Sequence, residues 1–255
     1  MENIYTSILD AQKKGQRAAL CIVIETAGSA PQKPGAKMLV YENGTIAGTI
    51  GGGSIEKQVI ETALEILKKS TPQKIKFNLD TDLSMHCGGI MEIYIEPLTQ
   101  FPKLYIWGAG HVGKAVAHAV KNMGFTIYLI DFRENIFSEE EKNIATCIQK
   151  DYFTAIDEIQ FDHNTYSVIV TPNHSYDEEL LAKLAKLPHA YIGMIGSIRK
   201  VALAKKRFLE ERILTEEELS KVDMPIGIKI AAETPEEIAI SIVAKLIDVK
   251  NTLKK

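Results

Sequence analysis

Hydrophobic and polar positions in the first hundred residues follow a mixed order of helix and strand patterns. Apolar residues recur at helical spacing in two segments, and β-branched apolar runs typical of strands lie around them. The dipeptide Asn43-Gly44 accepts the positive φ angles of a tight turn, which predicts a hairpin around it. In chain order the predicted elements are a helix (2–14), a strand (18–25), a hairpin (37–41 and 45–48), a helix (55–69) and two strands (74–79 and 90–96). This order predicts an α+β domain, which we assign to residues 1–98.

Beyond a linker at 99–102, the pattern changes to short apolar strands that alternate with amphipathic helices. The strands are predicted at 104–107, 126–130, 167–170 and 190–195. Near the end of the chain, Thr234, Pro235 and Glu237 supply a capping hydroxyl, a proline at the first helical position and the glutamate of a capping box, which predicts a helix start. Alternating strands and helices predict a doubly wound parallel sheet, which we assign to residues 103–250.

Composition limits the function classes without selecting one. The 255-residue chain is 45% hydrophobic and 25% charged, as is typical of a folded soluble protein. Its net charge is only -3 and its Lys and Arg residues are scattered, so we expect no nucleic-acid partner. No apolar run approaches the roughly 18–20 residues of a membrane span, and the N-terminus does not have the pattern of a signal peptide. We therefore expect no membrane contact and a cytoplasmic location.

The glycine pattern at 108–113 predicts a dinucleotide-binding, Rossmann-like loop. It follows a predicted strand, opens a predicted helix and precedes a second strand that ends at Asp131. Gly108 would permit the tight turn, Gly110 would let backbone approach a pyrophosphate, and Gly113 would allow close helix packing. Asp131 would accept hydrogen bonds from ribose hydroxyls, and His111 is expected to face solvent or phosphate. The alternative is the same fold with a nucleotide site that has decayed or been reused.

The other glycine-rich loop and one cysteine add candidates in the first domain. Gly51, Gly52 and Gly53 precede a helix and either bind an anion or form a tight connection; the Lys of a Walker A loop is missing, so we do not predict ATP hydrolysis. Cys87 lies among glycines beside His86, where a thiolate would suit a soft metal or sulfur transfer.

The other two cysteines are predicted to have no chemical role. Cys21 and Cys147 lie in or near apolar strands and are expected to be small core residues. The three cysteines form no Cys-x-x-Cys pair, so we expect neither a structural zinc site nor a disulfide framework. The pattern does not identify any resident metal.

Polar residues after the later strands predict a crevice at the carboxyl edge of the sheet. His174 and Asp177 follow the third strand of the second domain, and Ser197 and Arg199 follow the fourth. Ligands bind at this edge in open α/β sheets, and hydroxyl and guanidinium groups suit phosphate. The alternative for each is helix capping with a solvated charge.

Taken together, these segments resemble the XdhC/CoxI family of accessory proteins for xanthine dehydrogenase and related molybdenum hydroxylases. One departure is Gln32, which stands where the family often has an arginine. A phosphate contact would be lost there unless Lys33 or Lys37 replaces it. The resemblance covers nearly the whole chain and rests on Glu25–Pro31, Pro34–Met38, Gly48–Gly53, Cys87–Gly89, Gly108–Gly113, His174 with Asp177, Ile195–Ser197 with Arg199–Lys200, and Pro225–Gly227 with Ala232–Ile238.

The resemblance implies an N-terminal XdhC/CoxI domain, a C-terminal Rossmann domain and a non-catalytic role in maturation. The protein would bind molybdenum cofactor and deliver its sulfurated form to an apo molybdenum hydroxylase, with a cysteine desulfurase as a further partner and a homodimer as a compatible assembly. Cys87 would then contribute to cofactor or sulfur handling. Two other functions stay open: an NAD(P)-dependent oxidoreductase with His111 or His174 as acid/base, and a nucleotide-sensing interaction protein.

Overall fold

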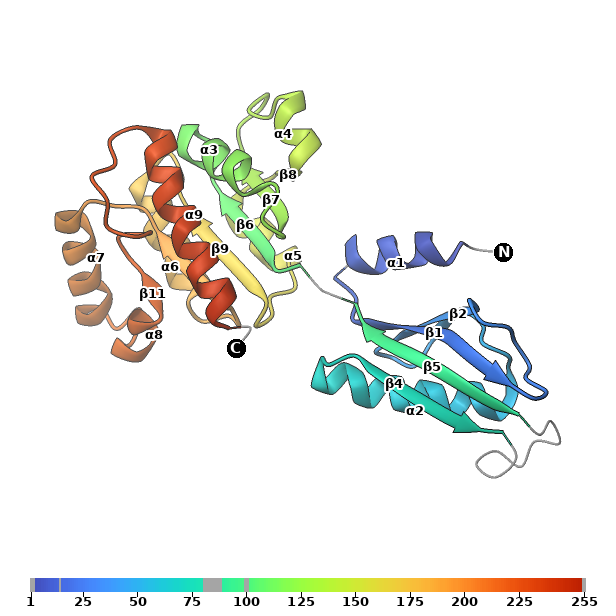
Figure 1. Ribbon diagram of the computed structural model, residues 1–255. Coiled ribbons are helices and arrows are strands. Elements are labelled where there is room, and N and C mark those ends of the chain that lie inside the picture. The colour runs from blue at the N-terminus through green and yellow to red at the C-terminus, as the bar shows by residue number, and fades with distance from the viewer. Residues whose placement is uncertain (1–2, 14, 80–88, 99–100, 254–255) are drawn as a thin grey trace. The chain divides into compact units, whose positions relative to one another are not determined.

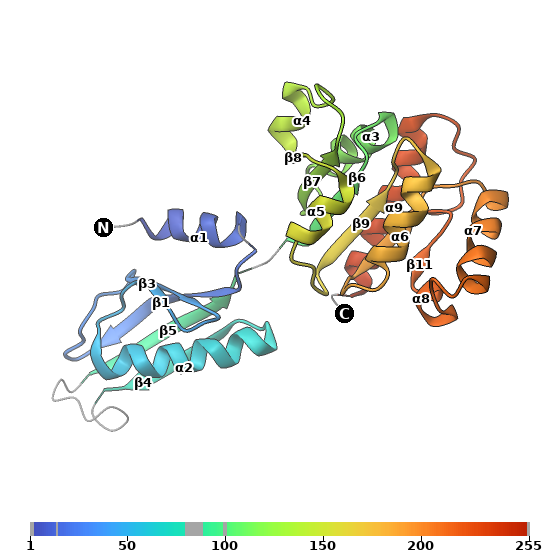
Figure 2. The same ribbon diagram turned by 180° about the vertical axis from the view of Figure 1, so that it is seen from behind.

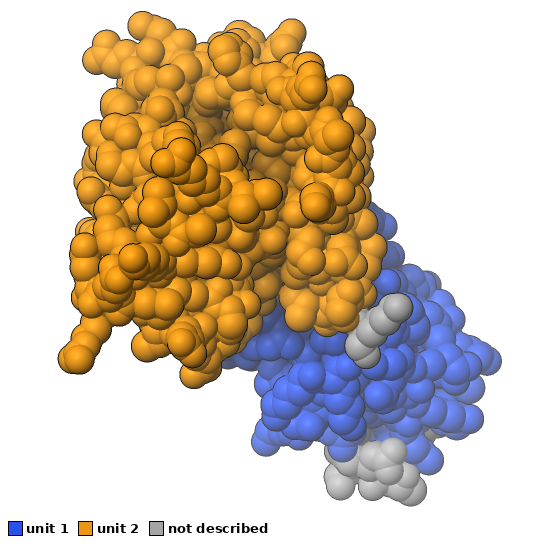
Figure 3. Space-filling view, turned by 90° about the vertical axis from the view of Figure 1, so that its left-hand side faces the viewer, with its two compact units in different colours: residues 1–101 blue, residues 102–255 orange. Residues whose placement is uncertain are grey.

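The structure is a computed structural model that describes residues 3–13, 15–79, 89–98 and 101–253. It divides into two compact units, Met1–Phe101 and Pro102–Lys255, which Figure 3 shows in different colours. Among the described residues, no helix is long and apolar enough to cross a membrane.

Unit 1 is an α+β unit built on one antiparallel sheet. The strand order is β3-β2-β1-β5-β4, and each neighbouring pair is antiparallel. The elements are α1 (Ile4–Lys13), β1 (Ala18–Ala27), β2 (Lys37–Tyr41), β3 (Ile46–Gly48), α2 (Gly53–Lys69), β4 (Gln73–Asn78) and β5 (Ile90–Pro97). The predicted hairpin is confirmed: Gly44 has a φ of 82°, and the Asn43 side chain accepts a hydrogen bond from the backbone N–H of Thr45 at 3.0 Å.

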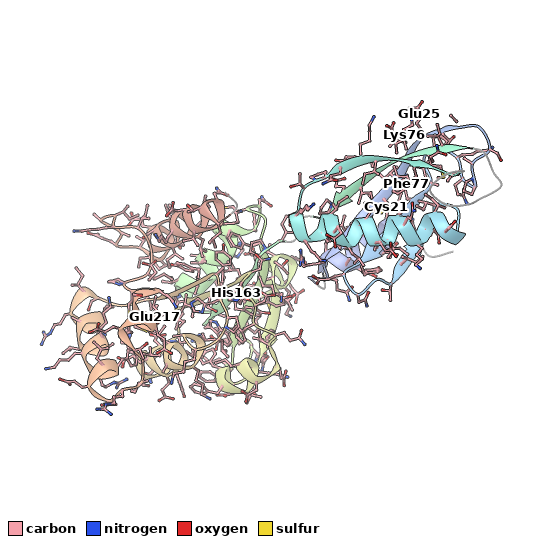
Figure 4. The ribbon with its side chains drawn as sticks, turned by 90° about the horizontal axis from the view of Figure 1, so that it is seen from below. Cys21, Glu25, Lys76, Phe77, His163 and Glu217 are labelled. Atoms are coloured by element: carbon pink, nitrogen blue, oxygen red, sulfur yellow. The ribbon has the colours of Figure 1, made fainter. Side chains whose placement is uncertain are left out.

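The core of unit 1 lies between the sheet and α2. Alternate strand residues point to opposite faces of a sheet, and a β-bulge between Val23 and Glu25 shifts this alternation in β1. A smaller apolar cluster that includes Leu39 packs on the other face, under α1. Cys21 and Phe77 point toward α2 and are buried, whereas Glu25 and Lys76 lie on the other face of the sheet and are exposed (Figure 4). This alternation fixes the register of the sheet beneath the helix.

Unit 2 is built on a parallel sheet, as predicted, with six strands where the sequence pattern placed four. The strand order is β11-β10-β9-β6-β7-β8. The strands are β6 (Lys103–Trp107), β7 (Thr126–Asp131), β8 (Thr146–Gln149), β9 (Thr165–Ile169), β10 (Tyr191–Met194) and β11 (Val222–Asp223). The helices are α3 (His111–Val120), α4 (Glu139–Ile144), α5 (Tyr152–Glu158), α6 (His174–Leu184), α7 (Ile198–Glu210), α8 (Glu216–Ser220) and α9 (Pro235–Thr252).

Helices cover both faces of this sheet. Helices α3 and α9 lie on the face turned to the viewer in Figure 1, and α5 and α6 lie on the opposite face, seen in Figure 2. Strand β6 contributes side chains to the cores on both faces of the sheet. Ile106 packs on the side of α3 and α9, and Trp107 packs on the opposite side. The predicted capping box is present at the start of α9, where Thr234 and Glu237 exchange hydrogen bonds and Pro235 follows the cap.

Candidate functional site

The loop after β6 has the backbone geometry that its glycines predicted. Gly108 has a φ of 111°, and a Cβ atom there would overlap the carbonyl oxygen of Val170 and lie 2.8 Å from its carbonyl carbon. A Cβ atom on Gly113 would overlap the carbonyl oxygen of Gly108, so α3 packs directly on the loop. A Cβ atom on Gly110 would meet nothing within 4 Å. Gly108 and Gly113 therefore allow close backbone packing around the loop, whereas Gly110 faces open space.

That open space belongs to a pocket at the switch point of the sheet. Strand order reverses between β6 and β9, and ligands of open α/β sheets bind where the carboxyl ends of such strands part. The pocket has a volume of about 500 Å³, within the range of about 300–1,000 Å³ typical of ligand sites. It is lined by Ala109, Gly110, His111, Val112, Lys114, Arg133, Ile136, Val170, Thr171, Pro172, Ile195 and Pro235.

The charges around this pocket, called the larger pocket below, favour binding of an anion. The N-terminus of α3 opens into it at Gly110, which gives the helix no side-chain cap, and His111 is exposed beside it. Arg133 and Lys114 add two cations to the lining. Both are partly neutralised, because Nζ of Lys114 lies 3.1 Å from the Glu141 carboxylate and Nη2 of Arg133 lies 2.7 Å from the Asp131 carboxylate. Backbone N–H groups, the helix dipole and a guanidinium all attract phosphate.

The carboxylate of Asp131 is already fully hydrogen-bonded in this structure. It is 0% exposed and accepts the backbone N–H of Ala109 at 2.8 Å. Arg133 donates to it through Nε at 2.9 Å, Nη2 at 2.7 Å and its backbone N–H at 3.0 Å. Burial opposes ionisation, but the hydrogen bonds from Arg133 and Ala109 outweigh it and lower the pKa of Asp131 below its ordinary value. The ribose contact expected of Asp131 stays a prediction, and it requires Arg133 to release the carboxylate first.

A second, smaller pocket gathers His174 and Asp177. It has a volume of about 230 Å³ and is lined by His174, Asp177, Glu178, Met194, Ile195, Gly196, Lys200, Val201 and Leu203. Asp177 is 1% exposed, and its Oδ1 accepts the backbone N–H and the hydroxyl of Thr171 at 2.9 and 2.7 Å. Its Oδ2 has no hydrogen-bond partner among the described residues, although Nδ1 of His174 lies 3.3 Å away. Burial raises the pKa of Asp177 despite the Thr171 hydrogen bonds.

Ser197 and Arg199, which were expected in the crevice, line neither pocket, and neither do Gly108, Gly113 and Asp131. Ser197 is the N-cap of α7 and accepts the backbone N–H of Lys200 at 3.3 Å, and the Arg199 side chain is exposed. In the structure they therefore have the capping and solvated-charge geometry, and their cofactor role stays a prediction. Lys200 lines the smaller pocket instead.

The glycine-rich loop of unit 1 holds an internal carboxylate. Glu56 accepts the N–H groups of Gly52 at 2.8 Å and Ile50 at 3.2 Å, together with the hydroxyl of Thr49. Burial opposes ionisation of Glu56, but these hydrogen bonds lower its pKa below the ordinary value. Anion binding at Gly51, Gly52 and Gly53 stays a prediction, and an external anion would compete with Glu56 for the loop N–H groups.

The predicted burial of the cysteines is confirmed for Cys21 and not for Cys147. Cys21 is fully buried, and burial raises its pKa to about 12, as expected of a core thiol. The core position expected for Cys147 was wrong in degree: its side chain is only half-buried, because β8 is the edge strand of the sheet. Cys87 and His86 lie outside the described residues. No group of three His, Cys, Asp or Glu side chains that could hold a metal ion occurs within the described ranges.

Three residues of these pockets were missed by sequence reasoning. Arg133 had a signal, since it stands two residues beyond the acidic strand end at Asp131. Lys114 had a weaker one, one helical turn after His111. The pairing of Thr171 with Asp177 had none, because it depends on how the loop after β9 folds back over the first turn of α6.

Two family models match the chain. The XdhC Rossmann domain matches residues 104–246, and the XdhC and CoxI family matches residues 11–78. The chain belongs to the XdhC family. The resemblance and the fold class drawn from the sequence are thereby confirmed.

Curated relatives differ in how much of their length the chain spans. It is 34% identical to the uncharacterized protein YqeB of Escherichia coli K12 over 98% of the chain, but spans only 46% of YqeB. It is 23% identical to a probable xanthine dehydrogenase subunit of Bacillus subtilis, covering 98% of both chains. It is 22% identical to the molybdenum cofactor insertion chaperone PaoD of Escherichia coli K12, covering 95% of this chain and 86% of PaoD.

One solved structure resembles the whole chain. The crystal structure of a xanthine dehydrogenase from Bacillus halodurans is 20% identical, with a TM-score of 0.52, and the match covers 98% of this chain and 95% of that one. At this identity the likeness supports the fold alone.

Proposed function

We propose that this chain is a maturation factor that binds molybdenum cofactor and helps load it into a xanthine dehydrogenase-like molybdenum hydroxylase. The observation that carries the proposal is the larger pocket, where an uncapped helix N-terminus, Arg133 and the open face of Gly110 meet at the switch point of the sheet. Family membership and the insertion chaperone among the relatives support the choice of cofactor.

The residues present fit a pterin cofactor that carries phosphate. The N–H groups at the start of α3 and the Arg133 guanidinium suit the phosphate. The smaller pocket offers a buried carboxylate oxygen that receives no well-aligned hydrogen bond in the described part of the chain. When bound, the cofactor supplies the molybdenum that the hydroxylase uses. The role of this chain is to hold the phosphate, exclude water from the ring and release the cofactor to its client.

Finer steps of this role are also proposed. The delivered form is the sulfurated cofactor, Cys87 takes part in cofactor or sulfur handling, a cysteine desulfurase supplies the sulfur, and the protein acts as a homodimer. The role of Cys87 is supported by its placement among glycines and by the resemblance at Cys87–Gly89. The desulfurase and the homodimer rest on the family resemblance alone.

One observation favours a second function, an NADP-dependent oxidoreductase. An arginine beside the acidic residue at the end of the second strand is how Rossmann sites accommodate a 2′-phosphate, and Arg133 stands in that place. The candidate acid/base residues weaken this function, because His111 lines the larger pocket and His174 the smaller one. Reduction or oxidation of a nicotinamide cofactor by the purified chain would favour it.

The test of the maturation role is activation of an apo-hydroxylase. Apo xanthine dehydrogenase is incubated with molybdenum cofactor alone, with the wild-type chain added, and with the Gly110→Val chain added. We expect the wild-type chain to raise the rate and final yield of active enzyme, and Gly110→Val to do neither while it melts cooperatively no more than about 4 °C below the wild type. Equal activation with and without the wild-type chain would contradict the proposed function.

A further inference from the structure

Asp177 is a buried carboxylate with one oxygen held by two hydrogen bonds and the other beside His174 without a well-aligned donor. Oδ1 is held by the backbone N–H and hydroxyl of Thr171, which fixes the orientation of the group. Oδ2 is buried and receives no well-aligned hydrogen bond among the described residues, and its nearest charged neighbour is Nδ1 of the half-exposed His174 at 3.3 Å. More than nine in ten buried polar groups in proteins are satisfied, and among the buried side-chain atoms without a partner in the described residues this oxygen is the one that lines a pocket.

The pocket around Oδ2 has the shape and chemistry of a ring site. Met194, Ile195, Val201 and Leu203 give it apolar walls, and Lys200 and His174 add polar groups to the lining. Its volume of about 230 Å³ is below the range of about 300–1,000 Å³ typical of sites for larger ligands, so it takes one small ring system rather than a dinucleotide. A carboxylate oxygen accepts hydrogen bonds, so the ring must present N–H donors.

We infer that this smaller pocket binds a 2-aminopyrimidin-4-one ring, with Oδ2 of Asp177 accepting from its 2-amino group and the adjacent ring N–H. Pterins and guanine share this edge. An adenine ring presents an amino group beside an unprotonated nitrogen, which would face Oδ2 with a lone pair. The assignment of the ring to the pterin end of molybdenum cofactor rests on the proposed function.

The two pockets are joined in a way that suits such a ligand. Ile195 lines both of them. Thr171 lines the larger pocket and also anchors Asp177 in the smaller one. A ligand with its ring on Asp177 and its phosphate at Gly110 would therefore bridge the carboxyl ends of β6, β9 and β10, which are neighbours in the sheet.

The test compares ligands that differ at one ring substituent. Binding of GMP, IMP and XMP to the full chain is measured by calorimetry; these purine nucleotides carry an amino group, a hydrogen and a carbonyl oxygen at the 2-position. Pterin and lumazine form a second pair, with an amino group and a carbonyl oxygen at the same position. We expect GMP to bind at least about tenfold tighter than IMP or XMP, and pterin at least about tenfold tighter than lumazine.

The decisive variant is Asp177→Asn. The amide keeps an oxygen for Thr171 but turns an N–H donor toward the ligand, so we expect the preference to reverse in favour of XMP and lumazine. Asp151→Asn is the matched control, because Asp151 caps the neighbouring helix α5 and lines neither pocket. It should keep the wild-type preference. A purely structural role for Asp177 would lower all affinities together without reversing the order.

The outcomes also separate the sources of the ring and the two proposals. Tighter binding of pterin than GMP assigns the site to a pterin, and the reverse order assigns it to a guanine nucleotide. Equal binding of GMP, IMP and XMP, or no reversal in Asp177→Asn, overturns the inference even if molybdenum cofactor binds and the proposed function stands. Discrimination of these ligands by a chain that does not bind molybdenum cofactor would keep the ring site and reject the proposed function. Absence of any binding rejects both.

Discussion

Substituting Gly110 by valine should remove ligand binding while leaving unit 2 folded. Gly110 has φ −74° and ψ −173°, an extended conformation that any residue adopts, and its Cβ would meet nothing within 4 Å. Valine is a poorer helix N-cap than glycine, but it also restricts the unfolded chain, so the net loss of stability should be within about 1 kcal/mol. For a unit of this size that lowers the melting temperature by about 2–4 °C. The isopropyl group would occupy the space where phosphate meets the helix N-terminus.

Gly113→Ala is the matched contrast. Its methyl group would overlap the carbonyl oxygen of Gly108, so α3 must move away from the loop after β6. Overpacking that displaces backbone in this way should cost about 3 kcal/mol or more, which corresponds to a fall of about 6–12 °C in melting temperature. The two glycines stand three residues apart in one motif and should fail in opposite ways, one in binding and the other in folding.

The assay is a melting curve for each variant and a calorimetric titration with NAD, NADP, FAD, ATP and AMP at up to millimolar concentration. We expect the wild-type chain to bind at least one of these ligands and Gly110→Val to bind it at least about 100-fold more weakly. Two results would refute the reasoning. One is wild-type affinity in a well-folded Gly110→Val chain, and the other is failure of the wild-type chain to bind any of the five.

Three further predictions concern stability and the cysteines. Burial opposes ionisation of Glu141, but hydrogen bonds from Ser138 and Lys114 lower its pKa to about 2, so Glu141→Gln should cost up to about 3 kcal/mol in a urea titration at pH 7. Because the folded pKa is depressed, this difference should shrink as pH falls below about 4.5; a difference independent of pH would reject the ionic origin. A fragment of residues 103–250 should fold alone with a cooperative thermal transition, whereas an insoluble or molten fragment would mean that the two units share one core. Cys87→Ser should reduce apo-hydroxylase activation with a melting shift equivalent to no more than about 0.5 kcal/mol, and equal activation by both proteins would reject a chemical role for the thiol.

Elements that depend on local pattern were predictable from sequence. The hairpin at Asn43-Gly44 and the capped start of α9 depend on residues within four positions of each other. Strands β8 and β11 are not among the four predicted strands, because both are short and lie at the edges of the sheet, where neither length nor burial leaves a pattern. Short edge strands are specified by their neighbour in the sheet rather than by their own sequence.

The candidate site was predictable in position and less so in chemistry. The glycine spacing located the loop after β6, because the steric needs of Gly108 and Gly113 are local to one strand–helix turn. The hydrogen-bond partner of Asp131 was not predictable, because the same sequence allows its carboxylate to face either a ligand or Arg133. The environment of Oδ2 of Asp177 was also hidden, since it depends on which side chains of α6, α7 and β10 surround it. Spacing thus locates a pocket, whereas the pairing of its polar atoms is decided by tertiary packing.

The most direct test of the proposed cofactor site is the stoichiometry with which molybdenum cofactor stays on the chain. Cofactor released from a molybdoenzyme under anaerobic conditions is mixed with the purified wild-type chain and separated by gel filtration, and molybdenum and protein are measured in each fraction. We predict close to one molybdenum per chain for the wild type and almost none for the folded Gly110→Val variant. Molybdenum that elutes apart from the wild-type chain, or that follows both proteins equally, would contradict a cofactor site at the carboxyl edge of this sheet.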